Sequence, residues 1–150
     1  MDARFVEIDH GSQLYRDELT LRNAILRVPL GMDLAHEDAS WEEDARHFGM
    51  VIADDLIGCA IALSDSDGQL RLKQMAVHER FQRKGVGAAL ICQIENAIRC
   101  DHAIDLVLHA RETAVGFYRK LGYRSNGSSF MEIGVPHIKM LKELLPHDLR

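Results

Sequence analysis

The chain contains 150 residues, of which 47% are hydrophobic and 27% are charged, and its formal net charge is −5. This composition is typical of a soluble globular protein, and the length suffices for one domain, residues 1–150, with a core of its own. A chain with this acidic balance is not expected to be a general nucleic-acid binder.

The three cysteines are odd in number and show no C-x-x-C spacing; they are Cys59, Cys92 and Cys100. We therefore expect reduced thiols and a cytoplasmic protein. The eight histidines form no H-x-x-x-H or Cys/His cluster, so no metal is expected. No stretch is apolar for long enough to cross a bilayer, so we expect no membrane partner. A homodimer stays possible.

The N-terminal part of the chain predicts one strand followed by two helices. Residues 4–8 alternate as in a short strand, and residues 13–28 carry apolar side chains at helical spacing after Ser12, which can cap the helix. The acidic stretch 32–46 predicts a short helix near Trp41, with Ser40 as its cap and Glu43 as the capping-box partner.

Two apolar runs, residues 48–53 and 56–63, predict an antiparallel hairpin. A turn of sequence SDSDG then leads into a strand over residues 70–77. After a polar turn, apolar residues recur at intervals of three and four: Val86, Leu90, Ile94 and Ile98. This change of period predicts a helix that begins at a glycine loop.

The glycine loop is the stretch Gln82-Arg83-Lys84-Gly85-Val86-Gly87. The first turn of a helix has unpaired backbone N–H groups and the positive end of the helix dipole, and glycines allow close approach of an anion. Arg80, Arg83 and Lys84 add positive charge. From the loop alone, a diphosphate site and an ordinary turn with a solvated basic face are equally good interpretations.

The C-terminal part predicts a buried strand over residues 104–109 and a helix over residues 113–121 that stops at Gly122. Tyr123 is expected to begin another strand. Residues 130–133 and 137–141 can pair as closing strands. The tail, residues 144–150, is expected to be frayed or a last helical turn.

The glycine loop is neither a P-loop nor a G-x-G-x-x-G fingerprint, because Lys84 precedes the glycines and position 90 is Leu90. It resembles the acyl-CoA signature Q/R-x-x-G-x-G/A of the GNAT superfamily of N-acetyltransferases. The second signature of that superfamily, A-x-x-F-Y-x-x-x-G-F/Y, matches a downstream set: Ala114, Phe117, Tyr118, Gly122 and Tyr123. The resemblance covers residues 48 to 142 and implies an α/β fold, a mixed, mostly antiparallel central sheet flanked by helices.

The resemblance implies acetyl-CoA as the donor substrate and an amine as the acceptor. The diphosphate is expected on the loop and the first helical turn, which comprise Gln82, Arg83, Lys84, Gly85, Val86, Gly87 and Ala88. The pantetheine arm is expected to pair with the backbone of Met75, Ala76 and Val77, and one of these N–H groups to meet the oxyanion. Where many members carry an asparagine that bonds this arm, the chain has Arg111.

Tyr118 occupies the tyrosine of the F-Y pair, so the resemblance implies that it protonates the leaving thiolate. The general base is open between Glu132 and His137, which flank Gly134-Val135-Pro136, with His109 or a water chain as alternatives. The acidic stretch 32–46 lies where the family lines its acceptor pocket. An acidic rim that attracts a cationic amine and a solvated loop face are both consistent with it.

The sequence therefore favours an acetyl-CoA-dependent N-acetyltransferase that acts directly on a primary amine. The alternatives are a catalytically silent acyl-CoA-binding or sensor domain and a protein that uses the loop for ATP. The absence of a P-loop lysine argues against ATP.

Overall fold

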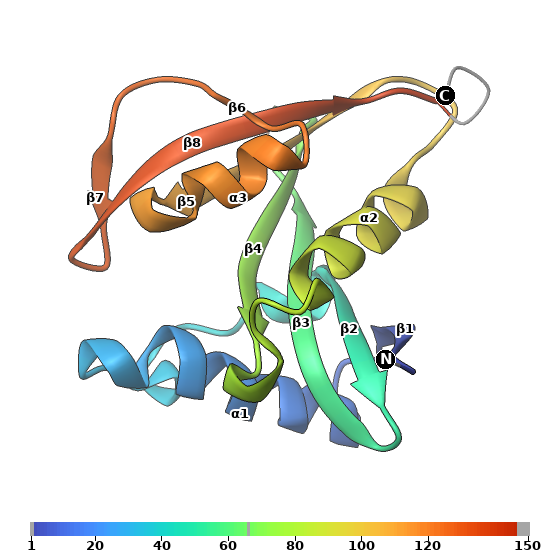
Figure 1. The fold of residues 1–150 in the computed structure, drawn as a ribbon, viewed down its shortest axis with the longest axis vertical. Helices are drawn as coiled ribbons and strands as arrows, with labels where there is room; N and C mark the ends of the chain where they lie inside the picture. The colour runs from blue at the N-terminus through green and yellow to red at the C-terminus, as the bar shows by residue number, and fades with distance from the viewer. Residues whose placement is uncertain (1, 66, 147–150) are drawn as a thin grey trace. The chain divides into compact units, whose positions relative to one another are not determined.

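The computed structural model describes residues 2–65 and 67–146. Hydrogen bonds place the strands in the order β1-β2-β3-β4-β5-β8-β6, with β7 pairing β8 (Figure 1). The strands are β1 (Arg4–Ile8), β2 (Arg46–Ile52), β3 (Asp55–Ser64), β4 (Leu70–Val77), β5 (Ile104–Arg111), β6 (Arg124–Ser125), β7 (Phe130–Glu132) and β8 (Val135–Leu144). β4 and β5 are parallel, whereas β1–β2, β2–β3 and the pairs made by β8 are antiparallel. This mixed, mostly antiparallel sheet flanked by helices confirms the fold that the resemblance implies.

Contacts divide the chain into two units, and β4 contributes to both. The first unit is Met1–Leu63 with Gln74–Ala97, and the second is Ser64–Lys73 with Ile98–Arg150. Among the described residues, no helix combines the length and apolarity needed to span a membrane.

The first unit contains helix α1 (Gln13–Leu26) and most of helix α2 (Val86–Ile98). Ser12 caps α1 as predicted, because its hydroxyl accepts the N–H of Tyr15 at 3.1 Å. Leu90 and Ile94 of α2 are fully buried, which confirms the predicted apolar face. A Cβ on Gly58 of β3 would lie 3.2 Å from Val86, so this glycine lets the start of α2 approach the strand closely.

The short helix predicted near Trp41 is present as a single 3₁₀ turn, Glu42–Asp44, but its N-cap residue is Trp41 and not Ser40. A second 3₁₀ turn, Leu34–His36, lies earlier in the acidic stretch. Ser40 does not act as a cap, since its own N–H donates to the Asp38 carboxylate at 3.0 Å. An Asp side chain that bonds the backbone two residues on favours a turn over a helix.

The second unit contains helix α3 (Val115–Lys120) and the long antiparallel pair β5–β8. The predicted pairing of the closing strands is confirmed, but the turn consists of Ile133 and Gly134, which both have positive φ, as a tight hairpin turn requires. Val135 and Pro136, expected in the turn, belong to β8. β8 extends beyond the predicted end to Leu144, which is fully buried. The predicted tail therefore loses its first residue to the strand, and residues 147–150 lie outside the described part.

Candidate functional site

The glycine loop leaves β4 and enters α2 through two left-handed residues, Arg83 (φ +62°) and Gly85 (φ +83°). The side chain of Gln82 donates to the carbonyl of Val77 at 2.9 Å and so closes the loop onto the end of the strand. The carbonyl of Gly85 accepts the N–H of Ala89 at 3.0 Å, which begins the helical ladder. The first-turn N–H groups before Ala89 therefore point out of the helix end.

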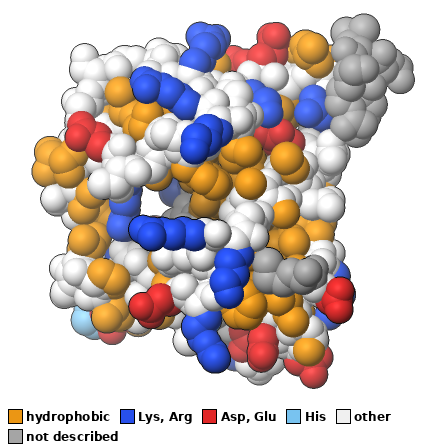
Figure 2. Space-filling model, viewed as in Figure 1, with side chains coloured by type: hydrophobic (Ala, Val, Ile, Leu, Met, Phe, Trp, Pro, Cys, Tyr) orange, Lys and Arg blue, Asp and Glu red, His pale blue; other side chains and the backbone are white. Residues whose placement is uncertain are grey.

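Positive charge lies around this loop. Arg80, Arg83 and Lys84 are exposed, and the Lys84 ammonium lies 5.9 Å from the ring centroid of Phe81. Figure 2 shows Lys and Arg side chains at the surface over the part of the first unit that contains the loop. A helix N-terminus with flanking cations can hold a phosphate group.

The strand segment expected to hold the pantetheine arm begins after an irregular residue. Gln74 has φ +53°, and the parallel register between β4 and β5 covers Leu70 to Leu72 only. The side chain of Ala76 is buried, and the N–H of His78 donates to the carbonyl of Ile57 on β3 at 2.8 Å. The described β4–β5 ladder thus stops before Met75–Val77, the three residues predicted to pair with the arm.

Tyr118 lies on α3 in the second unit and is 8% exposed. Its ring makes edge contacts with Phe117 and Tyr123, at centroid distances of 5.0 and 5.8 Å. Burial raises the pKa of Tyr118 to about 12, so the hydroxyl is protonated at neutral pH. A protonated hydroxyl can donate a hydrogen bond. Arg111, the residue in place of the family asparagine, ends β5 and begins a 3₁₀ turn.

The two base candidates, Glu132 and His137, come together in the second unit with two further side chains. The pairing of Phe130 with His137 puts Glu132 and His137 on one face of the β7–β8 hairpin. His109 Nδ1 lies 3.0 Å from Glu132 Oε1, and His137 Nε2 lies 3.6 Å from Glu132 Oε2. Arg71, which the sequence reasoning missed, lies 2.6 Å from His109 Nδ1. We call these four residues the Glu132 cluster.

The Glu132 cluster is open and incompletely satisfied. Burial would raise the pKa of Glu132, but the hydrogen bond with His109 and the nearby charges lower it below its usual value. His137 Nδ1 lies 2.7 Å from the carbonyl of Val135 and must donate to it, so the neutral ring has its lone pair on Nε2. The Nε atom of Arg71 is buried without a hydrogen-bond partner. A neutral imidazole beside a carboxylate can accept a proton.

Sequence reasoning also missed a buried ionic cluster in the first unit, which we call the Arg22 cluster. It consists of Tyr15, Glu18, Arg22, Glu42 and His47. Arg22 donates to Glu18 at 2.8 Å and to both oxygens of Glu42 at 2.9 and 2.8 Å. The Tyr15 hydroxyl donates to Glu42, and His47 Nδ1 lies 2.8 Å from Glu18. The i, i+4 spacing of Glu18 and Arg22 on the apolar side of α1 was the available signal.

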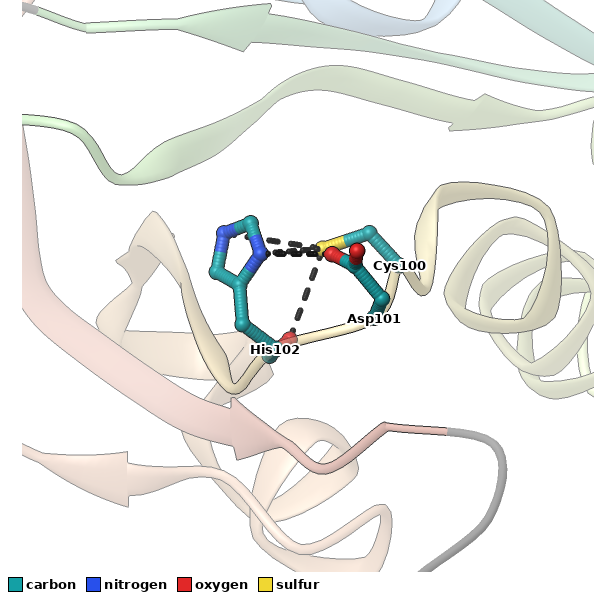
Figure 3. Close-up of side chains that lie close together, drawn as sticks. All are labelled: Cys100, Asp101 and His102. Carbon is teal, nitrogen blue, oxygen red and sulfur yellow. Dashed lines mark hydrogen bonds and ion pairs between the residues drawn. The ribbon is translucent and has the colours of Figure 1, made fainter.

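Two groups of potential metal ligands occur among the described residues. In the first, Glu18, Glu42 and His47, the guanidinium of Arg22 already supplies the cation. The second is Cys100, Asp101 and His102 (Figure 3), in which Asp101 is 98% and His102 71% exposed at the side chain. His102 pairs with Asp101 at 3.0 Å, and Cys100 donates to the His102 carbonyl at 3.4 Å. These bonds account for the closeness of the side chains without an ion.

Comparison with known proteins gives one consistent result. A family model described as an acetyltransferase (GNAT) domain matches residues 32–144. The uncharacterized N-acetyltransferase YjcF of Bacillus subtilis is 33% identical over 78 residues, which is 51% of this chain and 56% of that protein. The chain spans about half the length of the curated relatives it matches.

Solved structures share the fold. Escherichia coli ElaA superposes with a TM-score of 0.78 at 24% identity, over 93% of this chain and 99% of that one. An aminoglycoside 6'-N-acetyltransferase, solved with coenzyme A, superposes with a TM-score of 0.74 at 18% identity, over 96% of this chain and 98% of that one.

Proposed function

Because this chain belongs to the GNAT acetyltransferase family, we propose that it transfers the acetyl group of acetyl-CoA directly to the nitrogen of a primary amine. The observation that carries the proposal is the glycine loop. Its left-handed residues Arg83 and Gly85 turn the chain into the N-terminus of α2, a helix of 13 residues, and its cations are exposed. A helix end of this kind suits a diphosphate.

In the proposed reaction the amine nitrogen attacks the thioester carbonyl, the new C–N bond forms and the C–S bond breaks. The diphosphate binds the N–H groups of residues 83–88, and the arm pairs with the backbone of Met75–Val77. The carbonyl of Val77 already accepts a hydrogen bond from Gln82. Because an oxyanion needs a hydrogen-bond donor, we assign it to an N–H group of this segment, that of Met75 or Val77.

The leaving thiolate takes a proton from Tyr118 in this proposal. A phenol with a pKa of about 12 is a weak acid toward a thiolate, whose ordinary pKa is roughly 8.5. Its contribution to the rate is therefore a hydrogen bond that strengthens as charge builds on the sulfur. After the sulfur has taken the proton, solvent reprotonates the tyrosine. Tyr118 needs no base of its own for this role.

The proton of the attacking amine goes to the Glu132 cluster. We propose His137 as the acceptor, through its Nε2 lone pair, with Glu132 stabilising the imidazolium that forms. The geometry that supports this is the 2.7 Å bond from His137 Nδ1 to the Val135 carbonyl, which fixes the tautomer. His109 holds the other oxygen of Glu132.

Calorimetry with acetyl-CoA, CoA and ATP tests the donor site. We expect acetyl-CoA and CoA to bind and ATP to bind at least tenfold more weakly. Gly87→Glu places a side chain and a negative charge at the loop, so the affinity for acetyl-CoA should fall by more than about tenfold, or 1.4 kcal/mol. The matched control is Gln93→Glu, which adds the same charge on the exposed side of α2, away from the loop.

An acceptor screen separates the enzyme from a silent acyl-CoA-binding domain. The burial of Tyr118 is the observation that favours the silent domain. Free CoA thiol and acetylated product, followed by mass spectrometry across a panel of amines, should appear together for at least one amine. Tight binding of acetyl-CoA with no product from any amine would favour the silent domain.

A further inference from the structure

A pocket of about 480 Å³ opens in the first unit between α1 and the segment that follows it. One wall is a face of α1 that includes Leu19 and Ala24, and the other is formed by residues of 28–42, with Leu34 and Ala39 among them. Gln74 of β4 closes one side. A volume of this size is typical of a small-molecule site, and the surface exposed to the pocket is mainly apolar.

The charged part of the lining is acidic. Four carboxylates line the pocket, those of Asp33, Glu37, Asp38 and Glu42, and no Lys, Arg or His is among the described lining residues. An aliphatic wall with carboxylates suits a cation that carries an apolar body, because the two parts of such a ligand are satisfied separately.

The four carboxylates divide into two pairs. Glu42 is held by both terminal nitrogens of Arg22, and Glu37 is held by Arg27 through two hydrogen bonds. The charges of Glu42 and Glu37 are therefore neutralised by arginines that do not line the pocket. The two glutamates shape the wall and leave little charge for a ligand.

Asp33 and Asp38 carry the uncompensated charge. Each uses one oxygen to accept a backbone N–H at 3.0 Å, from Ala35 and from Ser40. Neither forms an ion pair with a cationic side chain of the described residues. Hydrogen bonds from Ser40 lower the pKa of Asp38, so its carboxylate is ionised at neutral pH. The pocket therefore has two anionic groups without a cation.

We propose that this pocket binds the acceptor and that the acceptor is a protonated primary amine on an apolar body. That the ligand is the acceptor rests on the proposed acetyl transfer. Gln74 supports the connection, since it lines the pocket and directly precedes Met75–Val77, where the donor arm is assigned. Its side-chain oxygen accepts the Nε–H of Arg22 at 2.8 Å, which fixes this side of the pocket. The bound ammonium must lose its proton before the nitrogen attacks.

Binding alone, without acetyl-CoA, tests the class of ligand. We would titrate the protein with 2-phenylethylamine, with 2-phenylethanol, which has the same body without the charge, and with spermidine, which has charge without an apolar body. The amine should bind at least tenfold more tightly than either. Equal or tighter binding of the alcohol or of spermidine, or no binding of the amine, would overturn the proposal.

Variants test whether the amine binds in this pocket. Ala24→Leu fills the pocket from an exposed position of α1 that tolerates leucine, so affinity for 2-phenylethylamine should fall at least tenfold. Asp38→Asn should weaken binding about twofold to fivefold, as expected for an exposed ion pair. Glu43→Gln, an exposed neighbour outside the lining, is the matched control. Unchanged affinity in a folded Ala24→Leu variant would exclude this pocket.

The two proposals fail differently. If 2-phenylethylamine binds as described and no acetylated product forms with acetyl-CoA, the proposed transfer is wrong and the ligand class stands. If amines are acetylated with the same KM in wild type and Ala24→Leu, the transfer stands and the pocket is not its acceptor site.

Discussion

The Arg22 cluster and the Glu132 cluster contain the same kinds of side chain, and they differ in closure. In the first, Glu18, Arg22 and His47 are each at most 1% exposed, and two carboxylates balance one guanidinium and one imidazole. In the second, Glu132 is 38% and Arg71 29% exposed at the side chain, whereas His137, at 5%, is buried beside Glu132. A closed, balanced cluster contributes to one folded arrangement, whereas an open one can exchange protons with a substrate or water.

Hydrogen bonding draws the same distinction. Each terminal nitrogen of Arg22 faces a carboxylate, and its Nε faces Gln74. In the Glu132 cluster, His109 Nδ1 faces both a donor, Arg71, and an acceptor, Glu132, and one nitrogen cannot serve both at once. Charged side chains alone therefore do not identify a reactive site. The Glu132 cluster differs from the Arg22 cluster in having polar groups whose hydrogen bonds are incomplete.

The largest expected effect is on stability. Arg22→Met leaves Glu18 and Glu42 buried without their cation, so the free energy of unfolding should fall by about 3–5 kcal/mol. Arg71→Met is the matched change in the open cluster and should cost about 1 kcal/mol or less. Urea denaturation measures both. Equal losses for the two arginines would remove the distinction between the clusters.

The next effect is on turnover. Tyr118→Phe removes only the hydroxyl, so kcat should fall by about tenfold to a thousandfold while the affinity for acetyl-CoA changes little. Tyr123→Phe removes a hydroxyl from the neighbouring ring and should alter kcat far less. A wild-type kcat in Tyr118→Phe, measured where chemistry limits turnover, would refute the acid role.

A smaller effect on turnover is expected at the open cluster. Glu132→Gln should lower kcat by about tenfold, because the imidazolium of His137 would lose its carboxylate, and should leave the unfolding free energy nearly unchanged. Glu143→Gln, on the exposed side of β8, is the control. If Glu132→Gln instead destabilises the fold and leaves kcat intact, the cluster is structural.

The smallest effect is a pH dependence of stability in the closed cluster. Burial would lower the pKa of His47, but the hydrogen bond and charge of Glu18 raise it above its usual value. The stabilisation from protonated His47 is therefore complete below a pH of about 6.5 and is lost as pH rises through the folded-state pKa.

The difference in unfolding free energy between wild type and His47→Gln should accordingly shrink as pH rises from 6.5. Burial would also raise the pKa of Glu42, but Arg22 and Tyr15 lower it, so its contribution is lost as pH falls. Denaturation curves at several pH values measure both the loss above pH 6.5 from His47 and the loss at low pH from Glu42. A difference that grows as pH rises toward 6.5 and is flat above it would mean that His47 is neutral in the folded protein.

The sequence predicts features that depend on neighbouring residues. The Ser12 cap, the start of α2 at the glycine loop and the β7–β8 hairpin are all local, and the structure confirms them. The hairpin in turn brings Glu132 and His137 to one face. The local failure is the cap at Ser40: its N–H donates to the Asp38 carboxylate, and Trp41 is the N-cap residue of the 3₁₀ turn instead.

Features that depend on distant pairing were not predictable. Arg71 and His109 are 38 residues apart and meet through the parallel register of β4 and β5, which no sequence pattern specifies. Glu18 and His47, 29 residues apart, meet through the packing of α1 beside β2. Polar residues on an apolar helix face, such as Glu18 and Arg22, were the sign that a buried partner existed.

The central claim is that acetyl-CoA gives its acetyl group to an amine on this protein. The most direct measurement is a single-turnover reaction with excess enzyme, acetyl-CoA and 2-phenylethylamine or another amine that the acceptor screen identifies. Free thiol and acetylated amine should form at the same rate and in equal amounts, with no acetylated protein in the intact mass. Thiol release without acetylated amine, or bound acetyl-CoA that persists unchanged, would contradict the claim.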